Sequence, residues 1–326
     1  MISQVLKFIL VGFLIFNLGV TAFTFLTPKP ESFASPVSGG QVLGAQFFFY
    51  STNLWKPNIE LIKESSLSPP QINAKSALVV DLTTNEVLYA KNSKEKLPVA
   101  STVKILTAVV ALEHLKPSKV LTVSETASKV GEDFMGLTPD EKLTLEELLY
   151  GLLLPSGNDA AAAIAEGVAG SVSRFVDLMN TKAQILGAVD SKFVNPSGLE
   201  GDGEHYSTAA DLAIISKYAW ENFAEFRRIV GTKYHEIAYA AGTESAGDYT
   251  PEHKYFYLEN QTNLLGTYPG VKGIKPGFTP EAGLCLVTLA ENGGHQILGV
   301  VLGATDRRGD MEKLLNYSFA AQGVQI

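Results

Sequence analysis

The chain has 326 residues, 46% of them hydrophobic, which is enough for one core of about 250 residues once N-terminal segments are set aside. Its formal net charge of −8 argues against nucleic acid as a partner, because neutralising phosphates requires a basic face and the sequence has no polybasic cluster. The single cysteine, Cys285, lies in the apolar run GLCLVTLA, which predicts a buried, unreactive thiol and excludes an internal disulfide.

The N-terminus predicts a membrane anchor. Residues 8–26, FILVGFLIFNLGVTAFTFL, are apolar and long enough to cross a bilayer as a helix. Only Lys7 and the terminal amine precede them as positive charges, and no strong A-x-A cleavage site follows. We therefore expect residues 1–26 to be an export signal that stays as an anchor, with the rest of the chain on the periplasmic or cell-wall side. Cleavage of the signal would make the protein secreted instead.

Residues 27–70 are rich in proline, serine and glycine and predict a tether. If flexible, such a segment would reach roughly 35 to 40 Å from the membrane. Within it, residues 46–55, QFFFYSTNLW, are too aromatic for a plain linker. They fit either an added strand or a membrane-surface contact. The folded domain is expected to span residues 71–326.

The elements expected in this domain predict an α/β (α+β) fold. Residues 76–92 predict a β-hairpin around the turn TTNE. Strands are also expected near the C-terminus, where Asn292 and Gly293 supply the hairpin turn between the last two. Strands at both ends with helices between them predict one mixed, mainly antiparallel sheet flanked by helices, with a largely helical inserted region. The expected helices are 101–115, 145–154 after a capping box of Thr144 and Glu147, 158–168, 173–186, one from 208 onward and 310–319, and the expected late strands are 273–278, 284–290 and 296–304.

Lys104 is the first candidate catalytic residue, because it follows Ser101 by three residues at the start of a predicted apolar helix. Residues three apart are neighbours on a helix, and a buried ammonium is costly unless it is paired. If Ser101 begins the helix, the free N–H groups there favour an alkoxide. A lysine whose pKa is lowered by burial can then act as the base. The alternative is an ordinary N-cap serine with Lys104 reaching solvent, and S-x-x-K alone does not decide.

Two further motifs follow in the chain. SGN, Ser156 to Asn158, lies in a polar break between two predicted helices, and KPG, Lys275 to Gly277, lies at a predicted strand. S-x-x-K and these motifs occur in the order found in penicillin-binding proteins and class A β-lactamases. From about residue 74 to residue 320 the chain resembles the serine-type D-alanyl-D-alanine carboxypeptidases, the low-molecular-mass penicillin-binding proteins. The likeness rests on ASTVK, LLLPSGNDAAAAIAE, FVDLMNTKAQILGA, FVNPSGL followed by HYSTAADLAII, and GVKGIKPGFTPEAG.

The resemblance implies a β-lactamase-like fold and a role for each motif residue. Ser101 would attack the carbonyl between two D-alanines, Lys104 would accept its proton, and Ser156 would relay that proton to the leaving amine. Asn158 would hold the substrate's amide and help position the lysine. Lys275 would attract the terminal carboxylate and, as a nearby cation, help keep the pKa of Lys104 low.

The third motif departs from the family pattern. The backbone N–H groups of Ser101 and Phe278 would form the oxyanion hole. The family normally has Lys-Thr-Gly, whereas here Pro276 precedes Gly277, so a hydroxyl for the carboxylate and a backbone donor are both missing. Thr279 is a weaker candidate to supply the hydroxyl. Altered substrate binding and an inactive scaffold are both compatible with this change.

The expected function is therefore removal of the terminal D-alanine from peptidoglycan stem peptides, with β-lactams as inhibitors and no cofactor or metal. The alternatives are a D,D-endopeptidase of cross-links, a catalytically inactive wall-binding homologue, and a β-lactamase. A β-lactamase is disfavoured because the motif is SGN rather than SDN and no deacylating glutamate can be placed.

Other patterns are less informative. The five histidines show no H-E-x-x-H pairing, and His205 beside GLEGDGE fits a solvated loop better than a metal site. No G-x-S-x-G motif occurs. Many relatives carry a second β-rich domain and a C-terminal anchor, and because this sequence stops at GVQI we expect neither.

Overall fold

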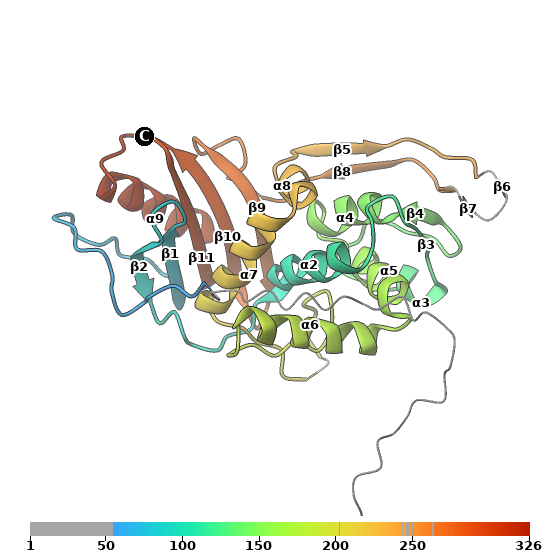
Figure 1. Cartoon of the computed structure of the whole chain (residues 1–326), viewed down its shortest axis with the longest axis horizontal. Coiled ribbons are helices and arrows are strands. Elements are labelled where there is room, and N and C mark those ends of the chain that lie inside the picture. The colour runs from blue at the N-terminus through green and yellow to red at the C-terminus, as the bar shows by residue number, and fades with distance from the viewer. Residues whose placement is uncertain (1–54, 202, 243, 246–247, 250, 263) are drawn as a thin grey trace, which may run out of the picture. The chain divides into compact units, whose positions relative to one another are not determined.

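A five-stranded antiparallel sheet forms the centre of the fold, with its strands in the order β2-β1-β11-β10-β9 (Figure 1). The structure is a computed structural model that describes residues 55–201, 203–242, 244–245, 248–249, 251–262 and 264–326. Strands from the two ends of this part of the chain meet where β1 pairs with β11, Ser76 opposite Leu302. The predicted fold class is confirmed. The strands are β1 Ser76–Asp81, β2 Glu86–Lys91, β9 Val271–Thr279, β10 Gly283–Asn292 and β11 His295–Ala304.

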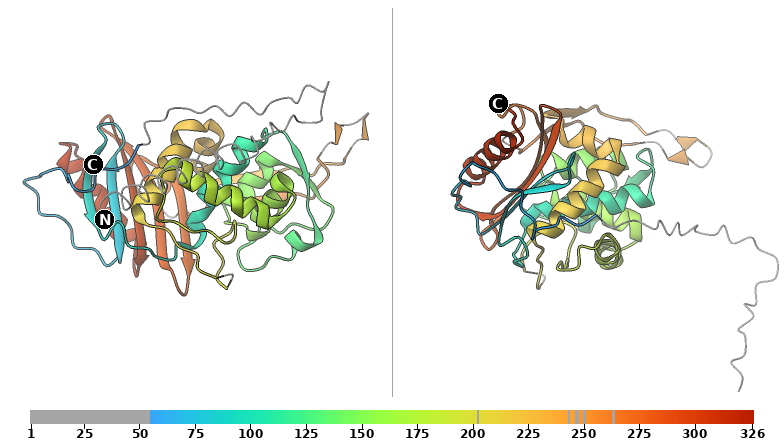
Figure 2. Two further views of the ribbon diagram at one scale, coloured as in Figure 1. Left: turned by 60° about the horizontal axis from the view of Figure 1, so that its bottom comes forward. Right: turned by 60° about the vertical axis from the view of Figure 1, so that its left-hand side comes forward.

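Helices cover both faces of this sheet (Figure 2). On one face, Leu314 and Phe319 of the last helix, α9, pack with Val79 and Val301. Of the helices between β2 and β9, which form the predicted helical region, α7 and α8 contact the other face and most of the others pack on one another. They begin with a 3₁₀ turn, η1. The helices are η1 Ala100–Val103, α2 Lys104–His114, α3 Glu125–Ser128, α4 Leu145–Leu153, α5 Asn158–Ala169, α6 Val172–Leu186, α7 Ala209–Asn222, α8 Ala224–Val230 and α9 Arg307–Ala321.

The central strands are apolar on both faces because both faces are covered. β1 reads SALVVD and is buried at every position. β11, HQILGVVLGA, is buried along its middle. Strands covered on two sides need a continuous apolar run rather than an alternating one, and these two sequences have it.

The helix predicted from the capping box is α4. The Thr144 hydroxyl accepts from the backbone N–H of Glu147 at 3.2 Å, and the Glu147 carboxylate accepts from the N–H of Thr144 at 2.7 Å. The box satisfies two N–H groups that the first turn of a helix leaves without partners. The remaining strands form three short pairs around this helical region: β3 Val120–Thr122 with β4 Lys142–Thr144, β5 Tyr234–Ile237 with β8 Phe256–Glu259, and β6 Glu244–Ser245 with β7 Asp248–Tyr249.

The turn between β10 and β11 lies one residue later than predicted. Asn292 belongs to β10 and pairs with His295, and the two turn residues are Gly293 (φ 57°) and Gly294 (φ 83°). A two-residue turn of this kind needs positive φ at both positions, which glycine adopts at no steric cost. Asn292 instead donates from its side chain to the carbonyl of Pro269 at 2.9 Å.

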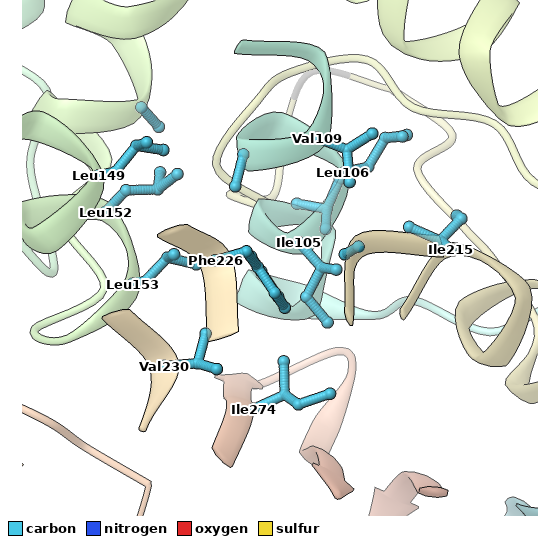
Figure 3. Close-up of a cluster of buried hydrophobic side chains, with 14 of the residues drawn as sticks. Ile105, Leu106, Val109, Leu149, Leu152, Leu153, Ile215, Phe226, Val230 and Ile274 are labelled. Carbon is cyan, nitrogen blue, oxygen red and sulfur yellow. The ribbon is translucent and has the colours of Figure 1, made fainter. Parts of the chain in front are cut away.

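The core holds α2 and β9 in a fixed relation. Figure 3 shows the ring of Phe226 on α8 between Leu153 of α4 and Ile105 of α2, close to Ile274 of β9. These four side chains are at most 1% exposed. Such tight packing leaves little room for relative movement. Lys104 begins α2 and the KPG motif lies on β9, so this packing helps to fix the position of Lys104 relative to that motif.

The N-terminal predictions fall largely outside this structure. Residues 8–26, the expected anchor, and the aromatic stretch up to residue 54 lie outside the described residues. Within the described part of the chain, no helix is both long and apolar enough to cross a membrane. Ahead of β1, Ile62 forms a parallel bridge with Val87 of β2.

Candidate active site

Ser101 and Lys104 meet at the junction of η1 and α2. The α-helix begins at Lys104, so the predicted helix start at Ser101 is wrong: residues Ala100–Val103 form a 3₁₀ turn. Side chains three residues apart eclipse one another in a 3₁₀ turn, which brings the two groups together. Lys104 Nζ lies 2.8 Å from Ser101 Oγ.

Lys104 is fully buried, so the alternative in which it reaches solvent is wrong. Its Nζ also donates to Asn158 Oδ1 at 2.7 Å and to the carbonyl of Ser197 at 2.7 Å. Burial, and then the charge of Lys275, hold the pKa of Lys104 well below its ordinary value. A neutral amine has two N–H groups and one lone pair. If Asn158 and Ser197 take both N–H groups of the neutral form, its lone pair is left for the serine hydroxyl.

Several carboxylates oppose this lowering. The negative charges of Asp133, Asp159 and Glu132 raise the pKa of Lys104, although burial outweighs them. When Lys104 is protonated, these negative charges compensate its buried positive charge. The protonation of Lys104 therefore depends on elements that are distant in the sequence.

Lys275 supplies the second cation. It lies in the middle of β9 rather than at the start of a strand, is fully buried, and donates to the carbonyl of Pro276 at 3.2 Å. Burial lowers the pKa of Lys275 to about 7, with the charge of Asp133 opposing this change and that of Arg307 adding to it. A bound anion would favour the protonated form, so the residue is suited to attract a carboxylate.

Ser156 lies in the short connection between α4 and α5, and Asn158 is the first residue of α5. Ser156 has a φ of 69°, unusual for a residue other than glycine. Its Oγ is buried without a hydrogen-bond partner among the described residues. A buried hydroxyl without a hydrogen-bond partner destabilises the fold, so such a group often has a role in binding or catalysis. Asn158 is also buried, and its Nδ2 donates to the carbonyl of Gly131 at 3.0 Å, which leaves Oδ1 directed to Lys104.

The edge strand β9 approaches η1 closely at Gly277. A methyl group there would lie 3.0 Å from the backbone nitrogen of Ser101, so only glycine fits without displacement. Phe278, the next residue, is 60% exposed. Thr279 is buried, and its Oγ1 accepts from the N–H of Ala282 at 3.1 Å in the turn to β10. The Thr279 hydroxyl therefore has a structural partner already.

Two contributors were missed by the sequence analysis. Arg307, at the start of α9, donates from Nη1 to the carbonyl of Gly277 at 2.8 Å and adds positive charge beside Lys275. No local signal in the sequence indicated it. Ser197 contributes only its backbone carbonyl, although the stretch FVNPSGL that contains it carried part of the resemblance.

Gly198 gives a test of how closely the loop after Ser197 must approach η1. It has a φ of 86°, and a Cβ there would lie 2.1 Å from the carbonyl oxygen of Ala100. We expect Gly198→Ala to push the loop away and to lower the rate of β-lactam acylation by about 10²-fold. The free energy of unfolding of the Gly198→Ala variant should fall by about 1–3 kcal/mol.

Gly201→Ala is the matched control for this prediction. Gly201 also has a positive φ, 100°, but a Cβ there meets nothing within 4 Å. Stopped-flow acylation and thermal denaturation of both variants separate backbone strain from loss of contact. Equal acylation rates in the two variants would show that the close approach at Gly198 does not matter.

The fold is that of the penicillin-binding serine peptidases: an antiparallel sheet with helices on both faces and a serine–lysine pair at the N-terminus of α2. The family model described as D-alanyl-D-alanine carboxypeptidase, peptidase S11, matches residues 63–306, and the chain belongs to this family.

Individual relatives agree with this assignment. D-alanyl-D-alanine carboxypeptidase DacF of Bacillus subtilis is 38% identical over 257 residues, which are 76% of this chain and 62% of the relative. The chain thus spans less than two thirds of that relative's length. The D-alanyl-D-alanine carboxypeptidase of Streptomyces sp. strain K15 is 34% identical over 274 residues, covering 78% of this chain and 90% of that one.

Solved structures show the same fold. The crystal structure of the Streptomyces K15 DD-transpeptidase has a TM-score of 0.69 at 34% identity and covers 78% of this chain and all of that chain (100%). D-alanyl-D-alanine carboxypeptidase DacD from Francisella tularensis has a TM-score of 0.68 at 28% identity, covering 78% of this chain and 73% of that one.

Proposed function

We propose that the protein is a serine-type D-Ala-D-Ala carboxypeptidase that removes the terminal D-alanine of peptidoglycan stem peptides through an acyl-enzyme on Ser101. The observation that carries this proposal is the 2.8 Å contact between Ser101 Oγ and a buried Lys104 whose pKa lies well below its ordinary value. A serine hydroxyl becomes a nucleophile when a base of this kind takes its proton. Family membership supplies the substrate class.

The reaction would proceed in two halves. Lys104 takes the Ser101 proton as Oγ bonds to the carbonyl carbon, and the resulting oxyanion accepts from the backbone N–H groups of Ser101 and Phe278. Removing one such donor typically costs about 10² to 10³ in rate. The carbon–nitrogen bond then breaks, and Ser156 passes its hydroxyl proton to the departing amine of D-alanine while it takes up the proton held by Lys104, which becomes neutral again. Water next attacks the acyl-enzyme carbonyl as Lys104 accepts a proton from it. The bond to Oγ then breaks, Ser101 takes back that proton, and the shortened peptide leaves.

Lys275 and Arg307 would hold the terminal carboxylate. Lys275 lies in β9, and Arg307 on α9 donates to the carbonyl of Gly277 in that strand. The low dielectric of the site would strengthen the attraction of both cations for a carboxylate. This arrangement supplies charge at the position where Pro276 lacks the hydroxyl of the usual threonine. Retention of both positive groups favours an active enzyme over a silent wall-binding homologue.

The same acyl-enzyme leaves other acceptors possible. The Streptomyces K15 protein, at 34% identity, is named a DD-transpeptidase in its solved structure, and an acyl group can pass to an amine as well as to water. A D,D-endopeptidase differs only in the leaving group.

We also propose that residues 71–326 form the catalytic domain and act outside the cytoplasm, with residues 8–26 as the anchor and residues 27–70 as the tether.

Product analysis tests this proposal. The protein is incubated with a pentapeptide ending in D-Ala-D-Ala and, separately, with a cross-linked dimer, with and without an added amino-acid acceptor, and the products are identified by mass spectrometry. We expect free D-alanine and tetrapeptide from the pentapeptide, and slower cleavage of the dimer. Faster dimer cleavage would indicate the endopeptidase, and an acceptor adduct as the main product the transpeptidase. No product together with no β-lactam adduct would identify the inactive homologue.

A further inference from the structure

Asp159, the second residue of α5, has a carboxylate that is enclosed by backbone N–H groups. Its Oδ1 accepts from Met135 at 2.8 Å, and its Oδ2 accepts from Gly136 at 2.8 Å and from Leu137 at 2.9 Å. Oδ1 also accepts from its neighbour Ala160 at 2.8 Å. The residue is 1% exposed. Successive backbone N–H groups that converge in this way form a nest for an anion, and here the anion is the protein's own side chain.

The loop anchored by this nest reaches the proposed catalytic centre. Its carbonyl at Gly131 accepts from Asn158 Nδ2 at 3.0 Å, and its carbonyl at Asp133 accepts from the backbone N–H of Asn158 at 2.8 Å. The contact to Gly131 orients the side-chain amide so that Oδ1 faces Lys104, and the contact to Asp133 holds the backbone of Asn158. A continuous chain of contacts therefore joins Asp159 to Lys104 through the loop and Asn158.

The described residues form no ion pair with Asp159, whose direct contacts are all with hydrogen-bond donors, and its charge also interacts with Lys104 without a direct contact. All four of its recorded partners are backbone N–H groups. An asparagine would fit the same volume but would turn an NH₂ group toward N–H donors. Such a change leaves buried donors unsatisfied, which costs more than the loss of an ordinary hydrogen bond.

We propose that Asp159 is a positioning residue for the reaction at Ser101: its carboxylate fixes the loop of residues 131–137, and the loop in turn orients Asn158 and Lys104. This inference rests on the proposed function. Asp159 itself would not touch the substrate. Its effect would be indirect, through the direction of the Asn158 amide.

The first test compares Asp159→Asn with Asp310→Asn. Asp310 on α9 is a matched control, because it is also 1% exposed and also accepts backbone N–H groups, from Asn73 and Ala74. Wild-type acylation by a β-lactam is measured first, and its absence would overturn the proposed function rather than this inference. We expect Asp159→Asn to lower the acylation rate constant by about 10²-fold, and Asp310→Asn to leave it within about twofold of the wild type.

The pH profile separates positioning from a purely structural role. The charges that face Lys104 are Lys275 on β9, Asp133 and Glu132 in the loop, and Asp159 on α5. Because the charge of Asp159 raises the pKa of Lys104, its removal should move the limb where acylation rises with pH to lower pH. An unmoved or upward-moving limb, or an equal loss of rate in Asp310→Asn, would overturn the inference.

A second variant keeps the inference testable if Asp159→Asn fails to fold. Gly136 has a φ of 94° with open space around its Cα, so Gly136→Ala strains the loop and leaves the carboxylate in place. Gly294→Ala, in the β10–β11 turn, has the same open space and a φ of 83°. We expect about a tenfold slower acylation in Gly136→Ala and an unchanged rate in the control. Equal rates would overturn the role of the loop.

Discussion

Ser101→Ala is expected to abolish covalent β-lactam binding and to lower D-alanine release by about 10⁴-fold or more. Oγ of Ser101 is the atom that would form the acyl bond, and alanine removes it without adding volume. The Lys104 amine keeps Asn158 and the carbonyl of Ser197 as partners. The variant should therefore fold, and its loss of activity should reflect the missing nucleophile.

Intact-protein mass spectrometry after incubation with a β-lactam measures this effect. The wild type should gain the mass of one β-lactam, and Ser101→Ala should gain none. Ser128→Ala is a suitable control, because this serine lies on α3 and its hydroxyl donates to the carbonyl of Glu125 in an exposed position. An adduct on Ser101→Ala equal to that on the wild type would place the nucleophile elsewhere.

The sequence predicted those parts of the fold that carry their own local signals. The capping box of Thr144 and Glu147 predicted α4, and continuous apolar runs predicted the central strands. The pairing of Ser76 with Leu302 could be inferred only from strands lying at both ends of the chain. The turn was misplaced because Asn292–Gly293 and Gly293–Gly294 both satisfy hairpin chemistry, and the register that chooses between them depends on the whole β10–β11 ladder.

The site was predictable to the extent that its contacts are local. Ser101 and Lys104 are three residues apart, so a single turn brings them together. The wrong helix start arose because a 3₁₀ turn and an α-helical turn share this spacing. The carbonyl of Ser197, 93 residues from Lys104, is placed by tertiary structure alone.

Side chains whose partners are backbone groups of another segment left no recognisable pattern in the sequence. Asp159 follows the SGN motif and, from sequence, reads as an ordinary acidic residue in the first turn of a helix. Only the folded loop shows that its carboxylate binds three N–H groups of another segment. Arg307 was missed for the same reason, because its partner is the carbonyl of Gly277 on a different strand. The roles assigned to Ser101, Lys104, Ser156, Asn158, Lys275, Gly277, Phe278 and Thr279 stay predictions.

Lys104→Met should have the second large effect, a loss of about 10⁴-fold in acylation rate. Methionine fills similar volume but cannot accept a proton, so the serine would lose its base. The pKa of Lys104 lies well below its ordinary value because of burial and the charge of Lys275. A group with a lowered pKa becomes neutral as pH rises through that pKa, so wild-type acylation should be lost in acid and rise to a plateau as Lys104 deprotonates.

The variant should lose the plateau as well as the rate. Without the amine, the residual reaction depends on hydroxide and should keep rising with pH. Lys91→Met is a matched control, because this half-buried lysine on β2 also donates to a carbonyl, that of Ile72 at 3.1 Å. Acylation rates across a pH series, with circular dichroism to establish folding, distinguish these outcomes. If Lys104→Met retained the wild-type limb and plateau, the titrating base would have to be another group, such as Lys275, whose pKa burial lowers to about 7.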